Sequence, residues 1–170
     1  MADGRLSVAP RTWLGIDPGT KKSGWSIWSP VEGVIRCGVD DNEALIDLLA
    51  DVPPEIDLDF SDIAIERFEA RGMPLGNESI ETVFWSGRFY ESARKLVEPR
   101  SVRRVGRGQV KLHLCGTMRA KDANIRAVLI DRYGGSRAEA IGTKKNPGPL
   151  HGVASHMWAA LAVAITAEES

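Results

Sequence analysis

The distribution of apolar and polar positions predicts short strands in the first part of the chain. Short apolar runs indicate strands at 13–17, 24–28, 34–39, 63–65 and 101–105. The first three are separated by brief turns, one of which bears glycine, and are therefore expected to form a meander. The segment 106–114 fits a short helix or a strand equally well.

Apolar residues at spacings of three and four predict helices between and after these strands. They are expected at 42–49, 77–97, 121–133 and 156–169. Asn42, Asn77 and Ser155 are suited to cap the first, second and fourth of these, whereas Pro99 ends the second. The stripe expected to face the core in the second helix is Ile80, Val83, Phe84, Gly87, Tyr90, Ala93 and Val97.

Three meandering strands followed by strands that alternate with helices predict a mixed α/β layer. The 170 residues suffice for one domain, which we place at 13–170 behind a flexible N-terminal tail at 1–12. No apolar run is long enough to cross a membrane, and no signal segment precedes Trp13, so a cytoplasmic location is expected. Cys37 and Cys115 lie far apart and are expected to be reduced thiols.

The net charge of −1 conceals an uneven distribution. Residues 100–145 contain twelve Lys or Arg and three acids, whereas the remainder contains ten basic and twenty acidic residues. Such a division is typical of a protein with one face for a polyanion, although Arg and Lys that merely solvate helix surfaces would give the same count. The candidate contacts are Arg103, Arg104, Arg107, Lys111, Arg119, Lys121, Lys144 and Lys145.

Two carboxylates share a placement at the end of a short apolar strand, Asp17 in the first strand and Glu66 in the fourth. Open α/β sheets build their sites at such strand ends, and two converging carboxylates can hold Mg²⁺ or Mn²⁺. A strand-end acid that faces solvent is the alternative for either residue alone. Glu69 is a weaker candidate because it lies beyond the strand.

His156 opens the last predicted helix and, within one turn, could point toward the same site. A local hydrogen-bonding role is the alternative for a histidine at a helix start. Lys111 and Lys121 could contact phosphate, as could any lysine of the basic segment.

The motifs GIDPGT with SGW, IAIERF, QVK with a later AKDANIR, and SHMWAALAVAIT follow one another between Trp13 and Thr166. In this order they resemble the RuvC-type Holliday-junction resolvases of the RNase H-like superfamily. The resemblance implies an α/β fold with an RNase H-like mixed five-stranded sheet flanked by helices. It also implies a homodimeric, structure-specific endodeoxyribonuclease that resolves four-way DNA junctions. Such an enzyme hydrolyses phosphodiesters with Mg²⁺, for which Mn²⁺ can substitute.

By the same resemblance, Asp17 and Glu66 correspond to the first two catalytic acids, and His156 to a position that carries Asp or His. These three are the expected metal ligands. Lys111 and Lys121 fall where the family has basic residues that assist cleavage. The loop GTKKNPGPLHG resembles bacteriophage-borne versions, which implies the cytoplasm of a bacterial cell or a phage-infected host. The candidates for a dimer interface or a junction-stacking surface are Phe84, Trp85, Phe89 and Tyr90.

The chain departs from the family pattern at Ala159, where a further Asp is usual three residues after the His156 position. Three explanations would account for this departure. The site has three protein ligands, the residue was substituted to stop cleavage, or the protein binds junctions without cutting them. The first motif also opens the nucleotide-binding fold of actin-like and sugar-kinase ATPases. Those proteins need two such lobes, for which this chain is too short.

Overall fold

The computed structural model describes residues 11–50, 60–70, 72, 74–96 and 101–170. Their centre is a five-stranded sheet in the order β3-β2-β1-β4-β5. The strands are β1 (Trp13–Asp17), β2 (Lys22–Ser29), β3 (Gly33–Asp41), β4 (Asp62–Arg67) and β5 (Val102–Gly106). The first three pair antiparallel as a meander, whereas β1, β4 and β5 pair in parallel. The predicted mixed five-stranded sheet is therefore confirmed.

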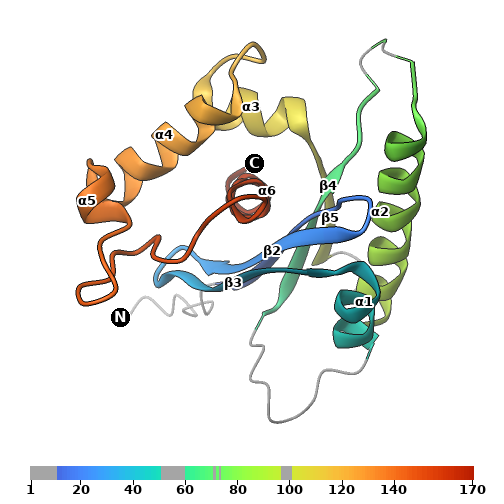
Figure 1. Ribbon diagram of the computed structural model, residues 1–170, viewed down its shortest axis with the longest axis horizontal. Helices are drawn as coiled ribbons and strands as arrows, with labels where there is room; N and C mark the ends of the chain where they lie inside the picture. The colour runs from blue at the N-terminus through green and yellow to red at the C-terminus, as the bar shows by residue number, and fades with distance from the viewer. Residues whose placement is uncertain (1–10, 51–59, 71, 73, 97–100) are drawn as a thin grey trace, which may run out of the picture.

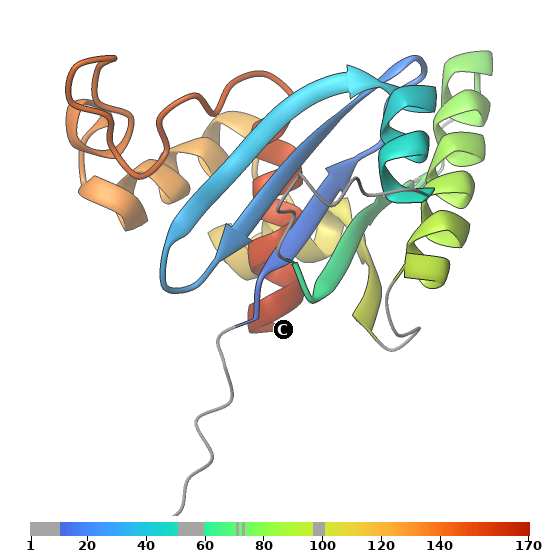
Figure 2. The same ribbon diagram turned by 90° about the horizontal axis from the view of Figure 1, so that it is seen from below.

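Helices cover both faces of this sheet. They are α1 (Asn42–Ala50), α2 (Asn77–Leu96), α3 (Arg107–Cys115), α4 (Asp122–Gly134), α5 (Arg137–Ala140) and α6 (Met157–Glu169). Figures 1 and 2 show α1 and α2 on one face and α6 on the other, with α3, α4 and α5 curving round the outside of α6. Within the described ranges, no helix is long and apolar enough to cross a membrane.

The alternation of side chains along β1 divides the core into two parts. Trp13 is fully buried on the face covered by α6, whereas Leu14 and Ile16 are buried on the face covered by α1 and α2. Residues an even number apart on a strand point to the same face. Asp17 is therefore directed, with Trp13, toward the side of α6.

Two glycines allow α6 to lie directly against the sheet. A Cβ at Gly15 on β1 would stand 2.1 Å from the Ala160 carbonyl oxygen, and one at Gly24 on β2 would stand 2.6 Å from the His156 carbonyl oxygen. Neither position admits a side chain unless the helix moves away. The alanine-rich sequence of α6 allows the same close packing, and the helix is buried along most of its length.

Polar contacts hold the opposite end of α6. Glu168 accepts a hydrogen bond from the Trp13 indole at 2.7 Å, and the Arg103 guanidinium donates to a carbonyl of the last helical turn. Glu169 accepts a hydrogen bond from Arg132 on α4 at 2.8 Å. This end of the helix lies at the start of β1, so Arg103 is remote from the end of β1 that carries Asp17.

The stripe predicted to pack in α2 is wrong over its first half. Three of its members are about half exposed: Ile80 at 55 %, Val83 at 48 % and Phe84 at 54 %. Ser86 and Phe89 are buried instead, and the Ser86 hydroxyl donates to the Glu66 backbone carbonyl at 3.3 Å. Apolar spacing misjudged the face because the buried side includes this serine. Phe89, being fully buried, is not available to the interface predicted for it.

The start of α6 differs from the sequence prediction, and the start of α3 resolves a segment that the sequence left ambiguous. Ser155 does not cap α6, because its backbone has φ +46° and the helix begins after His156, which makes no side-chain capping bond. The ambiguous segment 106–114 is helical, with α3 starting directly after Gly106. The short helix α5 was not predicted.

Parts of two predictions lie outside the described residues. These parts are residues 1–10 of the predicted tail, together with Val97 and Pro99 at the end of the second helix. The Thr12 carbonyl accepts hydrogen bonds from the backbone N–H groups of Ser61 and Asp62 at 2.9 and 3.2 Å. Contacts with the body of the fold therefore begin before Trp13.

Candidate active site

Asp17 is the last residue of β1, and the turn that follows fixes its position. The buried Asn42 side chain donates to the Gly19 carbonyl at 3.0 Å and accepts from the Ser23 hydroxyl at 2.6 Å. Ser23 in turn accepts from the Gly19 N–H at 3.1 Å. These bonds hold the turn closed, so the side chain of Asn42 serves the turn and not the helix cap predicted for it.

Glu66 lies beside Asp17 because β4 runs parallel to β1. Ile16 pairs with Ile65, so the next residue of each strand emerges at the same carboxyl edge of the sheet. The Asp17 and Glu66 side chains are each only 16 % exposed. The structure thus brings together the two acids that the sequence placed at strand ends.

His156 precedes α6 and contacts Asp17. Its Nδ1 atom lies 3.1 Å from Asp17 Oδ2, while its side chain remains 61 % exposed. The close contact of the helix start with Gly24 fixes the backbone at this point. His156 therefore holds Asp17 from the solvent side of the site.

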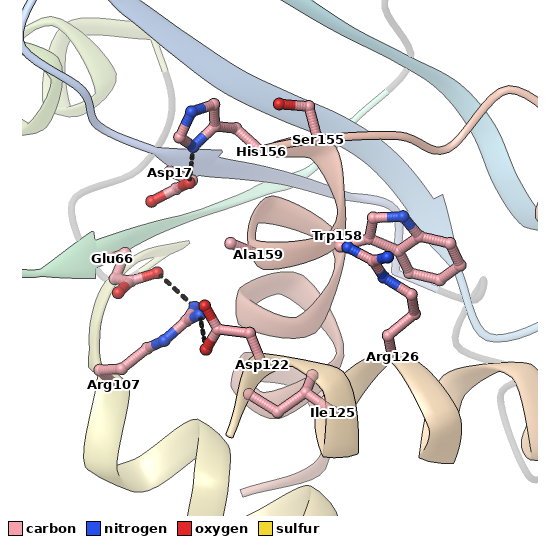
Figure 3. A pocket seen from close by; sticks show the side chains of 10 residues that line it. All are labelled: Asp17, Glu66, Arg107, Asp122, Ile125, Arg126, Ser155, His156, Trp158 and Ala159. Carbon is pink, nitrogen blue, oxygen red and sulfur yellow. Dashed lines mark hydrogen bonds and ion pairs between the residues drawn. The ribbon is translucent and has the colours of Figure 1, made fainter. Parts of the chain in front are cut away.

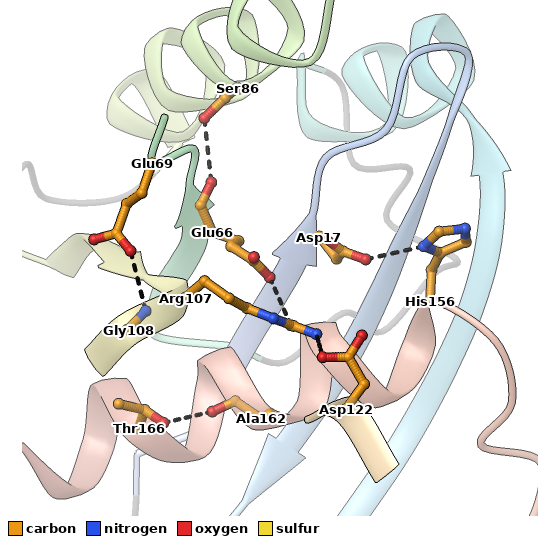
Figure 4. Close-up of polar contacts among 10 residues, drawn as sticks. All are labelled: Asp17, Glu66, Glu69, Ser86, Arg107, Gly108, Asp122, His156, Ala162 and Thr166. Carbon is orange, nitrogen blue, oxygen red and sulfur yellow. Dashed lines mark hydrogen bonds and ion pairs between the residues drawn. The ribbon is translucent and has the colours of Figure 1, made fainter. Parts of the chain in front are cut away.

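Arg107 and Asp122 add a second pair of charges. Arg107 donates to Glu66 Oε2 at 3.2 Å and to Asp122 Oδ1 at 2.5 Å, so its guanidinium bridges the two carboxylates (Figure 4). The sequence indicated Arg107 only as a DNA contact and did not indicate Asp122. Arg107 directly follows β5 at the sheet edge where Glu66 lies one residue before the end of β4, and that shared placement could have revealed it. Asp122 lies in the first turn of α4, where acids are common for reasons of helix stability.

Glu69 does not line this site but supports it. Its carboxylate accepts from the Gly108 backbone N–H at 3.1 Å and pairs with Arg67 at 3.1 Å. The absence of a side chain at Gly106 makes room, because a Cβ there would stand 2.2 Å from a Glu69 carboxylate oxygen. Glu69 thereby fixes the start of α3, and with it Arg107, against the end of β4.

These side chains line a pocket of about 430 Å³ (Figure 3). Its other lining residues are Ile125, Arg126, Ser155, Trp158 and Ala159. Ala159 lies one turn after His156 and presents only a methyl group to the space shared by the acids. A second depression, of about 630 Å³, shares Asp17 and His156 and extends over the turn after β1 to the start of α2.

Burial raises the pKa of both strand-end acids. Desolvation and the neighbouring Asp17 raise the pKa of Glu66 from its ordinary value of 4.5 to about 7, while Arg107 opposes the shift. Desolvation also raises the pKa of Asp17, although the hydrogen bond and charge of His156 oppose it. Burial would lower the pKa of the Arg107 guanidinium, but Glu66 and Asp122 raise it, so Arg107 stays charged.

The donor set fits a hard divalent cation in chemistry and charge. Asp17, Glu66 and Asp122 offer carboxylate oxygens, and these three negative charges with the positive charge of Arg107 leave −2 when all are ionised. Burial and the neighbouring Asp17 raise the pKa of Glu66 although Arg107 opposes them, so one guanidinium does not fully offset the negative charge gathered here. In the part of the chain that the structure describes, no three Asp, Glu, His or Cys side chains form a ready metal-binding group. Arg107 stands between Glu66 and Asp122 instead.

The remaining predicted DNA contacts lie outside the pocket. Lys111 on α3 and Lys121 just before α4 do not line it. Arg103 is engaged at the far end of α6, and Arg104 lies over the Tyr90 ring of α2 on the other face of the sheet. Strand alternation explains this, because neighbouring residues of β5 must face opposite sides.

Three further basic candidates lie in loops near the α3–α5 layer. Arg119 lies between α3 and α4, and Lys144 and Lys145 follow α5. Arg126 was not among the candidates, yet it lines the pocket with its guanidinium 5.4 Å from the centre of the Trp158 ring.

The sheet order and its flanking helices define an RNase H-like α/β protein. No family model matches the sequence, and no curated protein matches it. The Thermus thermophilus RuvC structure is similar with a TM-score of 0.58 and 20 % identity, covering 91 % of this chain and 92 % of that chain. T. thermophilus RuvC in complex with Holliday junction substrate is similar with a TM-score of 0.61 and 21 % identity, covering 92 % of each. The RuvC-type fold implied by the motifs is thereby confirmed.

Proposed function

We propose that the protein is a structure-specific endodeoxyribonuclease that resolves four-way DNA junctions by divalent-ion-dependent hydrolysis of phosphodiesters. The observation that carries the proposal is the meeting of Asp17 and Glu66 at one sheet edge, beside the basic α3–α4 layer. The fold supports it, since RuvC from T. thermophilus has been solved with a Holliday junction substrate.

Asp17 and Glu66 are the residues that would hold Mg²⁺ or Mn²⁺, and His156 fixes the orientation of the Asp17 carboxylate. When bound, such an ion supplies Lewis acidity and makes a water nucleophilic at neutral pH. Lys111 and Lys121, carried by the same helical layer as Arg107, are proposed to contact the phosphate backbone and offset its negative charge.

The shape of the site suits a polymer. Two depressions meet at Asp17 and His156, so a strand that crosses the acids has room on both sides. Arg126 lines one depression, and Lys21 and Lys22 line the other. A four-way junction has two symmetric cleavage points, so we propose a two-fold homodimer as the acting species.

The decisive test is cleavage of a synthetic four-way junction in Mg²⁺ or Mn²⁺ by the wild-type protein and by Asp17→Asn. The substitution removes a metal ligand with little change of shape, so cleavage should be abolished while junction binding stays nearly intact. Asp47→Asn, at an exposed position on α1, is the matched control and should cut normally. Cleavage by Asp17→Asn at the wild-type rate would place the site elsewhere.

A junction-binding protein without nuclease activity is the second candidate. Ala159 favours it, because the pocket side of α6 offers no carboxylate after His156. The same assay separates the two functions. Tight junction binding without nicks at any Mg²⁺ or Mn²⁺ concentration would select the binding protein.

A further inference from the structure

An acid is absent where α6 faces the pocket. Ala159 lies one turn after His156 and contributes a methyl group to the lining. The donors that line the pocket are Asp17, Glu66, Asp122 and His156, and Arg107 already engages two of them, Glu66 and Asp122. Each divalent ion needs compensating negative charge from its ligands, so a site with fewer carboxylates holds fewer ions.

A permanent cation stands at the same place. The Arg107 guanidinium contacts Glu66 at 3.2 Å and Asp122 at 2.5 Å, and its side chain is only 22 % exposed. A planar guanidinium can satisfy two carboxylates at once and does not lose its proton. Figure 4 shows the guanidinium lying between the Glu66 and Asp122 carboxylates.

Two hydrogen bonds to the backbone around the start of α3 fix the position of Arg107. Glu69 accepts from the Gly108 N–H at 3.1 Å, and the Gln109 side chain accepts from the Gly106 N–H at 2.7 Å. Both bonds fix the first turn of α3 directly after β5. Arg107 is therefore directed over the sheet edge by contacts that are independent of its own charge.

We propose that Arg107 is the built-in cation of this site: its guanidinium compensates Glu66 and Asp122, so that the protein binds a single divalent ion, at Asp17 and Glu66. The inference rests on the proposed divalent-ion-dependent function. Ala159, which offers no carboxylate, and the Arg107 guanidinium act in the same direction, because each limits the number of metal charges that the pocket can hold. Two of the five guanidinium N–H donors are engaged by the carboxylates, which leaves others for a phosphate oxygen.

A purely structural role for Arg107 predicts the opposite result. If the guanidinium only ties β4 to α4, then Arg107→Gln loosens the site and metal binding weakens or stays the same. If it occupies the place of a cation, its removal frees Glu66 and Asp122, and metal binding strengthens. The direction of the change therefore separates the two roles.

The experiment is Mn²⁺ titration of the full-length protein without DNA, followed by calorimetry and by the electron paramagnetic resonance signal of free Mn²⁺. We expect one ion per wild-type chain. Arg107→Gln should bind a second ion, or bind the first at least about tenfold more tightly, because a nearby positive charge is lost. Arg107→Lys keeps the charge and should retain one ion. Arg126→Gln is the matched control, since Arg126 lines the same pocket but lies over Trp158, and it should leave the stoichiometry at one.

Two ions in the wild-type protein, or an Arg107→Gln variant that binds Mn²⁺ no better than wild type, would overturn this inference and leave the proposed nuclease function standing. Failure of the wild-type protein to bind any Mn²⁺ would overturn both. Thermal unfolding without metal shows whether Arg107→Gln folds. If it does not fold, the wild-type stoichiometry decides alone, one ion supporting the inference and two refuting it.

Discussion

Glu66→Gln should stabilise the cation-free protein above neutral pH. Glu66 is largely buried, and desolvation together with the adjacent Asp17 raises its pKa to about 7. Its ionised form is therefore disfavoured in the folded protein relative to the unfolded chain. Glutamine keeps the shape of the side chain and removes the charge, so the variant escapes this cost.

The sign and the size follow from the two pKa values of Glu66. Because the folded-state pKa lies above the ordinary 4.5, the stability contributed by the protonated group is complete below pH 4.5 and is lost as the pH rises through about 7. At about 1.4 kcal/mol per pKa unit, the shift corresponds to about 3 kcal/mol. The stability of the variant relative to wild type should therefore grow by about 3 kcal/mol between pH 4 and pH 8.5.

Urea unfolding in EDTA across this pH range measures the difference. Comparing pH values cancels the contacts that glutamine alters at every pH. Glu81→Gln, which removes a carboxylate at an exposed position on α2, is the matched control. A pH-independent difference for Glu66→Gln would refute the reasoning, because Glu66 would then ionise as readily in the fold as in water.

Three further predictions concern the DNA face, position 159 and the packing of α6 against Gly24. Junction affinity should fall steeply with salt, because basic residues displace counterions from phosphates; a log–log slope near zero would exclude residues 100–145 as the DNA face. Ala159→Asp should tighten Mn²⁺ binding and raise the cleavage rate, by about tenfold or more, because the new carboxylate would face His156 and the acids; rates equal to wild type across a metal titration would contradict this. Gly24→Ala should lower the free energy of unfolding by about 1–3 kcal/mol and impair cleavage, because its methyl would meet the His156 carbonyl. Gly87→Ala on α2, where an added Cβ meets nothing within 4 Å, is its control and should not destabilise the protein.

The parts of the fold that could be predicted from sequence are those set by local periodicity. The five strands and the longer helices follow from apolar spacing, and Asp17 and Glu66 follow from their position at strand ends. The buried face of α2 could not be found this way, because a serine that bonds to the Glu66 backbone occupies it. Ser155 was wrongly predicted as a cap, because its left-handed backbone, with φ +46°, cannot be read from the residue type.

The positions of the arginines in the basic segment 100–145 also could not be predicted from local sequence. The sequence count treats Arg103, Arg104 and Arg107 as one group, but strand alternation and the start of α3 send them to three different places. Of these three, only Arg107 lines the pocket. Its meeting with Asp122 depends on how α4 folds back over α6, and that packing leaves no trace in local spacing.

Side chains along β1 point alternately to the two faces of the sheet, and this alternation limits where gaps can be placed when the sequence is aligned with distant relatives. Asp17 faces the pocket because it shares a side with Gly15, which tolerates no side chain beneath the Ala160 carbonyl. Inserting or deleting one residue within the strand would turn Asp17 toward α1 and α2 and drive Leu14 or Ile16 against α6. Alignment gaps therefore belong in the loops outside 13–17. At 20–21 % identity to the RuvC structures, strand register is a firmer guide to the alignment of Asp17 than matching letters are.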